Sequence, residues 1–320
     1  MSPVELAPPA ASDLLATIGN TPMVELPRLA PRAGVRLFAK LEGANPTGSV
    51  KDRVALAMVR DALASGALAP GQTILEPSSG NTGISLAMVG ARTGNPVRIV
   101  MPDNTTPERA QLLRLYGAEI VPSPGDEGSN GAIRVAQELA AADPNLFMPF
   151  QYGNEANPRA HFEGTGPEVL AQVPELDCFV AGLGTGGTLT GVGRYLRAAR
   201  PGARTIAAEP LPGELVQGLR SLDDGFVPPV LDAAVLDDRR LVSARDAIVG
   251  TRALLAEEGI LAGLSSGAVL HVALRVAAET DDDLAIVLLL PDGGWKYLST
   301  DLWTGDLDRL ANDFESAVLW

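Results

Sequence analysis

The chain has 320 residues, of which 46% are hydrophobic and 20% charged, a balance typical of a folded protein with room for about two domains. Lys and Arg number 25 against 39 Asp and Glu, and the net charge of −14 argues against partners such as nucleic acid or an anionic membrane surface. One cysteine and two distant histidines exclude a disulfide within the chain and do not suit a zinc site.

The N-terminal residues contain proline and acid rather than a basic start followed by an apolar run, so they do not resemble a secretion signal. The longest strongly apolar run, Leu284–Leu290, ends at Pro291 and is far shorter than the ~20 residues that span a bilayer. We therefore expect a cytoplasmic protein that does not associate with membranes.

Strand-like and helix-like segments alternate along most of the chain. Strands are predicted at 35–41, 73–75, 97–101, 119–122, 178–183, 205–209 and 284–290. Helices are predicted at 50–65, 81–92, 107–116, 130–142, 188–199, 243–257 and 268–279. This alternation is typical of parallel sheets covered by helices on both faces, and the sequence therefore predicts an α/β fold.

Short clusters rich in Gly, Ser, Asn and Pro follow several predicted strands. They lie at 45–48, 78–81, 182–187 and 263–267. Because ligands bind outside the carboxyl ends of parallel strands, we expect these four loops to form one shared site. We also expect the chain to divide into domains near Asn45 and again near Tyr152.

The segment Gly184-Thr-Gly-Gly-Thr188 follows a buried strand and opens a helix. Its backbone N–H groups and the helix N-terminus would hold a phosphate. Gly182, Gly184 and Gly187 also satisfy the dinucleotide pattern G-x-G-x-x-G, and Glu209 ends the next strand 22 residues after Gly187. The loop alone therefore permits either a phosphorylated cofactor or a nicotinamide dinucleotide.

Lys51 is one of only three lysines, and it stands at the start of a predicted helix. The helix dipole disfavours a cation at that end, so a solvated surface role explains this lysine poorly. A partly buried lysine at a positive helix end should have a lowered pKa and be a competent amine for forming an imine. Lys51 is therefore the candidate nucleophile.

Five motifs together make the sequence resemble one family. They are Pro46-Thr-Gly-Ser-Val-Lys-Asp-Arg53, Glu76-Pro-Ser-Ser-Gly-Asn-Thr-Gly83, Gly184–Thr188, Gly263-Leu-Ser-Ser-Gly267 and Tyr297-Leu-Ser-Thr300. In this order they resemble the cysteine synthases, pyridoxal-phosphate-dependent β-replacement enzymes of fold type II, and the resemblance spans roughly residues 17 to 300.

The resemblance implies two three-layer domains with mostly parallel twisted sheets and the active site between them. The larger, cofactor-binding domain would comprise residues 1–45 and 153–320. The smaller domain, residues 46–152, would move to close on the substrate. The relatives are homodimers, so a homodimer is expected.

The resemblance also implies a role for each matching residue. Lys51 would form an imine with pyridoxal 5′-phosphate and later remove the substrate's α-proton. The remaining cofactor contacts would be Asn81 at the 3-hydroxyl oxygen, Gly184, Thr185, Gly186, Gly187 and Thr188 at the phosphate, and Ser265 at the ring nitrogen. The substrate carboxylate would bind to Ser78, Ser79, Thr82 and Gln151. Sulfur would then add to an aminoacrylate intermediate and give L-cysteine.

Arg220 departs from the pattern, because O-acetylserine enzymes usually have glycine at its position. A guanidinium there could bind a leaving phosphate in a forked manner. The chain is therefore similar to the actinobacterial O-phosphoserine sulfhydrylases, which take sulfur from a thiocarboxylated small carrier protein or from sulfide. Alternatively, Arg220 is a surface residue paired with Asp223 or Asp224, and the substrate is O-acetyl-L-serine.

Two further interpretations would place the chain in a different class of protein. An NAD-dependent oxidoreductase is supported only by the 182–187 glycines and Glu209, and an inactive relative is disfavoured because Lys51 is present.

Val318–Trp320 could either enter the active site or dock on the surface. We expect His161 and Lys296 to be structural.

Overall fold

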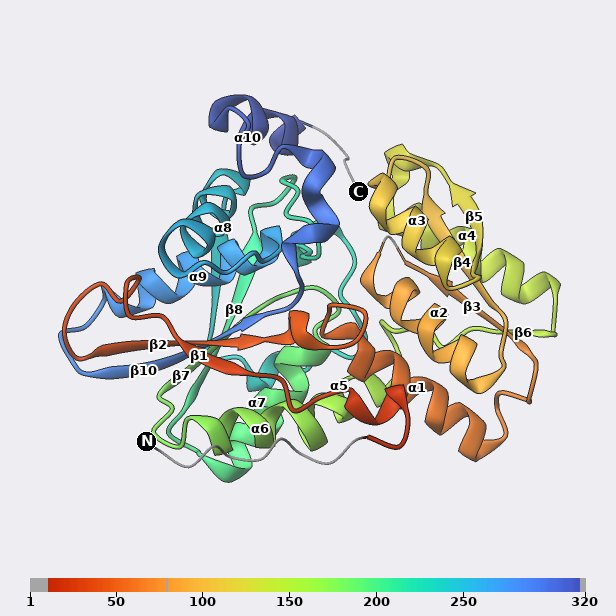
Figure 1. Cartoon of the computed structure of the whole chain (residues 1–320), viewed down its shortest axis with the longest axis horizontal. Helices are drawn as coiled ribbons and strands as arrows, with labels where there is room; N and C mark the ends of the chain where they lie inside the picture. The colour runs from red at the N-terminus through yellow and green to blue at the C-terminus, as the bar shows by residue number, and fades with distance from the viewer. Residues whose placement is uncertain (1–10, 79, 317–320) are drawn as a thin grey trace.

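The computed structural model describes residues 11–78 and 80–316, and two sheets organise it (Figure 1). The six-stranded sheet has the order β1-β2-β10-β7-β8-β9, with strands β1 Met23–Glu25, β2 Val35–Leu41, β10 Leu284–Leu290, β7 Cys178–Gly182, β8 Arg204–Pro210 and β9 Asp238–Val242. The four-stranded sheet has the order β5-β4-β3-β6, with strands β5 Glu119–Ser123, β4 Val97–Pro102, β3 Thr73–Pro77 and β6 Leu146–Phe147.

Nearly all strand pairs are parallel. Only β1 runs antiparallel to its neighbour β2 among the strands of the described residues. The central strand β10 reads Leu-Ala-Ile-Val-Leu-Leu-Leu and is buried from Ala285 onward. An uninterrupted apolar strand is what burial on both faces requires. The predicted parallel α/β architecture is confirmed.

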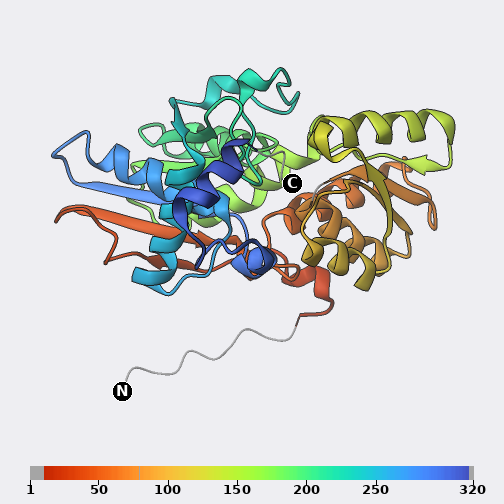
Figure 2. The same ribbon diagram turned by 90° about the horizontal axis from the view of Figure 1, so that it is seen from above.

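Helices cover both faces of each sheet, so each sheet is the middle of three layers (Figures 1 and 2). On the larger sheet α8 Ala244–Glu258 and α9 Leu264–Ala277 pack on one face, and α6 Gly166–Gln172 and α7 Gly187–Ala199 on the other. On the smaller sheet α1 Lys51–Ser65, α2 Asn81–Thr93 and α3 Pro107–Leu115 pack on one face, and α4 Gly128–Ala142 on the other. The chain also contains α5 Ala156–Ala160 and α10 Leu307–Ser316. The exact domain boundaries, 46–152 against the remainder, stay a prediction.

One predicted loop is part of a helix. Helix α9 begins at Leu264 rather than 268, so Ser265 lies in its first turn. A Cβ added at Gly267 would lie 2.0 Å from the Ala247 carbonyl oxygen, and one at Gly250 would lie 2.3 Å from the Gly267 carbonyl oxygen. Gly267 thus allows α8 and α9 to approach backbone to backbone, which explains a glycine that does not mark a turn.

The short strands β1, β6 and β9 and the helices α5, α6 and α10 were not predicted. Strand β6 has only two residues, and β9, at the edge of the sheet, begins with three charged residues, so neither has a strong pattern of its own. Within residues 11–78 and 80–316, no helix combines the length and the apolar character needed to cross a membrane. The predicted position of Val318–Trp320 lies outside the described residues.

Candidate active site

The carboxyl ends of strands from both sheets face one open cavity, with an empty volume of about 790 Å³ that includes some open solvent. Nine residues predicted from the sequence line it: Lys51, Ser78, Asn81, Thr82, Gln151, Gly184, Thr185, Arg220 and Ser265. A side cavity continues past Lys51 and Gly184 and is lined also by Gly186 and Thr188. Gly187 lines neither cavity, and Ser79 is outside the described residues. The structure therefore brings the predicted loops together.

Lys51 is the first residue of α1 and faces the cavity. The backbone before it is held in place, because the Val50 N–H donates to the Pro291 carbonyl at 2.8 Å. The Lys51 ammonium donates no hydrogen bond to any residue that the structure describes. Burial lowers the pKa of Lys51 to about 8, although the Asp292 carboxylate opposes the shift. A useful fraction of this amine is therefore neutral near pH 7.

The loop between β7 and α7 has the geometry of an anion site. Gly186 adopts φ +83°, which favours glycine, and a Cβ on Gly187 would lie 1.9 Å from Asn157 Oδ1. Thr185 Oγ1 accepts hydrogen bonds from Asn157 Nδ2 at 3.0 Å and from the Gly187 N–H at 3.3 Å. Gly186 and Thr188, on either side of the first residue of the 13-residue helix α7, line the side cavity, so the N-terminus of this helix lies at the cavity wall.

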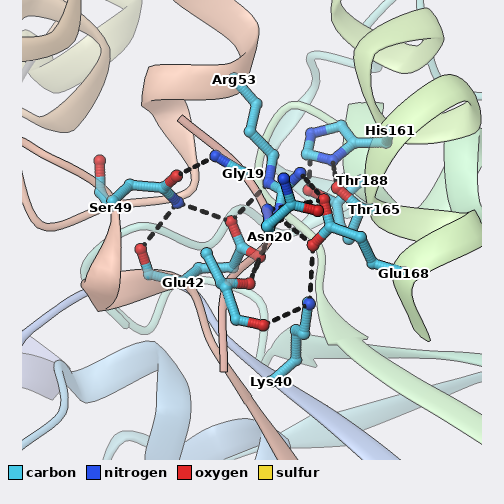
Figure 3. A network of polar contacts seen from close by, with 12 residues as sticks. Gly19, Asn20, Lys40, Glu42, Ser49, Arg53, His161, Thr165, Glu168 and Thr188 are labelled. Atoms are coloured by element: carbon cyan, nitrogen blue, oxygen red, sulfur yellow. Dashed lines mark hydrogen bonds and ion pairs between the residues drawn. The ribbon is translucent and has the colours of Figure 1, made fainter. Parts of the chain in front are cut away.

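His161 supports this loop from behind, a contact that was not predicted from the sequence (Figure 3). Its Nε2 lies 3.2 Å from Thr188 Oγ1, and its Nδ1 lies 2.9 Å from Thr165 Oγ1. The residues from His161 to Thr165 form a π-helix, a feature that is frequent near functional sites. Burial holds the pKa of His161 well below its usual value, so the neutral imidazole orients the Thr188 hydroxyl.

A buried ionic cluster anchors α1 two residues beyond Lys51 (Figure 3). Arg53 Nε donates to Glu42 Oε2 at 2.8 Å, and its terminal nitrogens donate to both Glu168 oxygens at 2.7 Å. Lys40 Nζ lies 2.7 Å from Glu168 Oε2. Burial alone would raise the pKa of Glu168, but Arg53 and Lys40 outweigh it, and the pKa falls to about 2. This cluster fixes the first turn of α1, and so the direction of Lys51.

The turn after β3 presents donors to the cavity. Ser78 Oγ accepts hydrogen bonds from the N–H groups of Gly80 at 3.2 Å and Gly83 at 3.0 Å, which leaves its hydroxyl hydrogen to donate. Thr82 Oγ1 donates to Gln151 Oε1 at 2.6 Å, which turns the Gln151 amide nitrogen away from Thr82. A group that offers a hydroxyl and an amide beside the N-terminus of α2 suits a carboxylate.

Glu76 holds the chain that carries Gln151. Its buried carboxyl group accepts the backbone N–H groups of Phe150 at 2.8 Å and Gln151 at 2.9 Å, and Phe150 has the unusual φ of +55°. Burial raises the pKa of Glu76 to about 8, against the effect of the two N–H donors. Asn157 continues this support by donating to the Gln151 carbonyl at 2.9 Å.

Arg220 reaches the cavity from the segment that follows β8. Its Nη1 donates to Asn130 Oδ1 at 3.3 Å, and its guanidinium lies 5.6 Å from the Tyr152 ring and 4.9 Å from the Phe226 ring. Arg220 forms no ion pair with any residue of the described chain, so the surface pairing with Asp223 or Asp224 is wrong. Within that part of the chain, this arginine at the cavity wall thus lacks an anionic partner.

The nicotinamide interpretation fails at its acidic residue. Glu209 is fully buried, and it accepts the Leu222 N–H at 2.7 Å and lies 3.6 Å from Arg239. Its carboxylate is therefore engaged within the protein and cannot meet a ribose.

The cavity is also lined by polar residues that were not predicted to bind substrate or cofactor, namely Arg109, Ser129, Tyr152, Asp292 and Tyr297. Asp292 could have been predicted, because it follows Pro291 at the end of a predicted strand. The glycine-bearing loops were assigned to the site because they follow the carboxyl ends of strands, and Asp292 has the same position. Arg109 had no such signal, since α3 presents it from within a helix.

Comparisons with known proteins agree with this geometry. The sequence profile of the family described as "Pyridoxal-phosphate dependent enzyme" matches residues 14–292. A probable cysteine synthase of Bacillus subtilis is 45% identical over 298 residues, 90% of this chain and 96% of that protein. A cysteine synthase of Staphylococcus aureus is 41% identical over 310 residues, 94% of this chain and all of that protein.

Solved structures are similar throughout. O-ureido-L-serine synthase has a TM-score of 0.87 at 44% identity and covers 94% of this chain and 99% of its own. O-acetylserine sulfhydrylase isoform 3 from Entamoeba histolytica has a TM-score of 0.86 at 35% identity and covers 97% of this chain and 99% of its own.

The cavity also fits pyridoxal 5′-phosphate on its own chemistry. A glycine-rich helix N-terminus suits the phosphate, and a buried amine with a lowered pKa suits the aldehyde. Ser265 has 3% of its surface exposed, and its neutral hydroxyl suits an uncharged ring nitrogen. The two cavities meet at Lys51, so one molecule can place its phosphate in the side cavity and its aldehyde beside the lysine.

Proposed function

This chain belongs to the family of pyridoxal-phosphate-dependent enzymes, and on that premise we propose that it makes L-cysteine by β-replacement on O-phospho-L-serine. The relatives named cysteine synthase and O-acetylserine sulfhydrylase support the β-replacement. Arg220, which pairs with no carboxylate of the described residues, supports a phosphate as the leaving group at the cavity wall. When bound, the cofactor withdraws electrons from the substrate's α-carbon and makes the α-proton acidic.

Lys51 carries the proton transfer in this proposal. Its pKa of about 8 lets the amine be neutral when it attaches the cofactor and when it takes the α-proton. The Arg53–Glu42–Glu168 cluster keeps its helix in place, so that Nζ stays directed at the cavity.

The remaining residues bind and orient. Ser78 and Gln151, with Ser79, would hold the substrate's carboxylate through hydroxyl and amide donors. Thr82, whose hydroxyl donates to Gln151, would add its backbone N–H at the start of α2. Gly184 to Thr188 would hold the cofactor's phosphate, and Asn81 would meet its ring oxygen. Ser265 cannot keep the ring nitrogen charged, so electron withdrawal is moderate, which suits elimination of a good leaving group.

Arg220 is the observation that carries the choice of substrate. A guanidinium can hold a phosphate by two parallel hydrogen bonds, whereas an acetyl group offers no charge to pair. The stacking on Tyr152 and Phe226 limits the orientations of this arginine. We therefore place the leaving phosphate beside Arg220.

The test compares two substrates. We expect Arg220→Ala to lower kcat/KM for phosphate release from O-phospho-L-serine by about 10- to 100-fold, because a hydrogen bond to a charged group is lost. The kcat/KM for acetate release from O-acetyl-L-serine should change little. Arg197→Ala is the matched control, because Arg197 is a half-exposed arginine that pairs with Asp237 at 3.7 Å and does not line the cavity. An equal loss on both substrates, or a preference for O-acetyl-L-serine, would assign the enzyme to the O-acetylserine sulfhydrylases.

The sulfur donor, the assembly and the compartment are further parts of the proposal. We propose sulfide or a thiocarboxylated small carrier protein as the donor, a cytoplasmic homodimer as the working form, and closure of residues 46–152 over the substrate. Measuring cysteine formation with each donor at equal concentration would separate the two sources of sulfur. Light scattering of the purified protein would report a monomer if the dimer is wrong.

A further inference from the structure

The Asn81 side chain lies between two charged groups. Lys296 Nζ donates to Asn81 Oδ1 at 2.7 Å, and Asn81 Nδ2 donates to Asp292 Oδ2 at 2.8 Å. Tyr297 Oη donates to the same Asp292 oxygen at 2.8 Å. One end of the amide therefore faces an ammonium group and the other end faces a carboxylate.

This arrangement is buried and specific. Lys296 is fully buried and Asp292 is 3% exposed. Lys296 Nζ also donates to the Gly48 carbonyl at 3.2 Å, next to the segment that leads to Lys51. Placing an ammonium group here has a cost in solvation that an apolar side chain of similar length would avoid. Packing alone therefore does not explain why a charged lysine, rather than an apolar residue, occupies position 296.

The two ends of a primary amide have nearly the same shape but opposite hydrogen-bonding character. Turning Asn81 over would place its NH₂ against the Lys296 ammonium and its oxygen against the Asp292 carboxylate. Both contacts would then be repulsive. The two charges therefore select one orientation. In that orientation the second N–H of Asn81 has no acceptor among the described residues, and Asn81 lines the cavity beside Lys51.

We propose that Lys296 and Asp292 are positioning residues that fix the Asn81 amide so that it offers the cofactor's ring oxygen only a hydrogen-bond donor. The inference rests on the proposed role of Asn81 as the residue that meets this oxygen. A donor at this position favours the ionised ring oxygen, whereas an amide oxygen would repel it. Lys296, which the sequence led us to expect as merely structural, would thus act on the cofactor through another residue.

Several charged groups surround the two positioning residues. Asp292, Asp52 and Arg109 act on Lys296, and Asp292 also acts on Lys51. Burial lowers the pKa of Lys296 to about 8, although both carboxylates oppose the shift. The side chain is therefore mainly an ammonium group at pH 7, and even its neutral form could donate to Asn81.

The test removes both charges while keeping side-chain size. The double variant Lys296→Met, Asp292→Asn should weaken binding of pyridoxal 5′-phosphate to the cofactor-free protein by about tenfold or more. It should also shift the absorption of the bound cofactor from its long-wavelength band toward the shorter one. Tyr297→Phe is the control, because it removes one donor to Asp292 and leaves both charges facing Asn81. We expect less than about a threefold change in it.

The decisive comparison repeats the double variant in Asn81→Ala. If Lys296 and Asp292 act through Asn81, the double substitution should add little there. Equal losses with and without Asn81, or an unchanged dissociation constant and spectrum in the double variant, would overturn the inference. If Asn81→Ala alone changes neither quantity, the proposed role of Asn81 fails instead. Thermal unfolding of the cofactor-free proteins checks folding, and the isosteric Asp292→Asn, with a smaller shift expected, carries the test if the double variant does not fold.

Discussion

Two lysines near the start of α1, the fully buried Lys40 and the half-buried Lys51, have opposite surroundings. Lys40 Nζ donates to the Thr21 carbonyl at 2.8 Å and to Gln172 Oε1 at 2.8 Å, and it pairs with Glu168 at 2.7 Å. Lys51 donates to none of the described residues and faces the cavity. The neighbours of each lysine thus decide its chemistry. Burial lowers the pKa of both lysines, but the Glu168 carboxylate opposes the shift at Lys40, whereas the pKa of Lys51 falls to about 8. The paired Lys40 therefore stabilises the fold, and the unpaired Lys51 is the better candidate for reaction.

The regions around these two lysines remain connected. Arg53, one half-turn beyond Lys51, joins Glu168 in the Lys40 cluster (Figure 3). The paired region therefore supports the reactive one without supplying chemistry to it. The following variants separate the two functions.

The largest effect is expected at the reactive lysine. Lys51→Ala should lower β-replacement activity by about 10³-fold or more, because the group that transfers the α-proton is lost. It should also abolish the absorption of covalently attached cofactor, while the fold remains. Lys40→Met is the matched control and should lower the thermal stability yet keep the covalent attachment. Visible spectra and thermal unfolding of both variants measure this, and covalent attachment surviving in Lys51→Ala would refute the assignment.

A smaller effect is expected in the paired region. Glu168→Gln should lower the free energy of unfolding of the cofactor-free protein at pH 7 by about 3 kcal/mol, because Arg53 and Lys40 lose their shared carboxylate. The pKa of Glu168 is lowered to about 2 in the folded protein, so its contribution is complete above about pH 4.5. That contribution is lost as the pH falls from there toward 2. Denaturant titrations from pH 7 to pH 3 should show a shallower loss in the variant than in the wild type. Parallel curves would mean that Glu168 has no special role.

The mildest test uses no mutation. In the proposed function Lys51 would react with the cofactor's aldehyde as a neutral amine, and its pKa is lowered to about 8. The rate of attachment to the cofactor-free protein should therefore rise with pH up to about 8 and then level off. Stopped-flow absorbance from pH 6 to pH 10 would follow this. A rate that keeps rising to pH 10 would show that Lys51 titrates like an ordinary, solvated lysine.

Much of the site could be predicted because its motifs are local. Gly184–Thr188 and the turn at Ser78 each lie at the end of a strand and the start of a helix, and a short sequence pattern reports such a turn directly. The residues that hold these loops in place from outside the cavity could not be predicted in this way. His161 meets Thr188 across 27 residues, and Glu76 meets Gln151 across 75. Neither contact leaves a periodic signal in the chain.

The sequence by itself determined the alternation of strands and helices, the position of the glycine loops and the choice of Lys51, because these depend on backbone preferences and hydrophobic periods over a few residues. Only the tertiary structure decided which lysine is paired, and which way the Asn81 amide faces. Lys296 and Asn81 are 215 residues apart in the chain, and Asp292 and Asn81 are 211 apart. Hydrogen bonds and ion pairs depend on distances of a few ångströms, which exist only once the two sheets have brought those segments together.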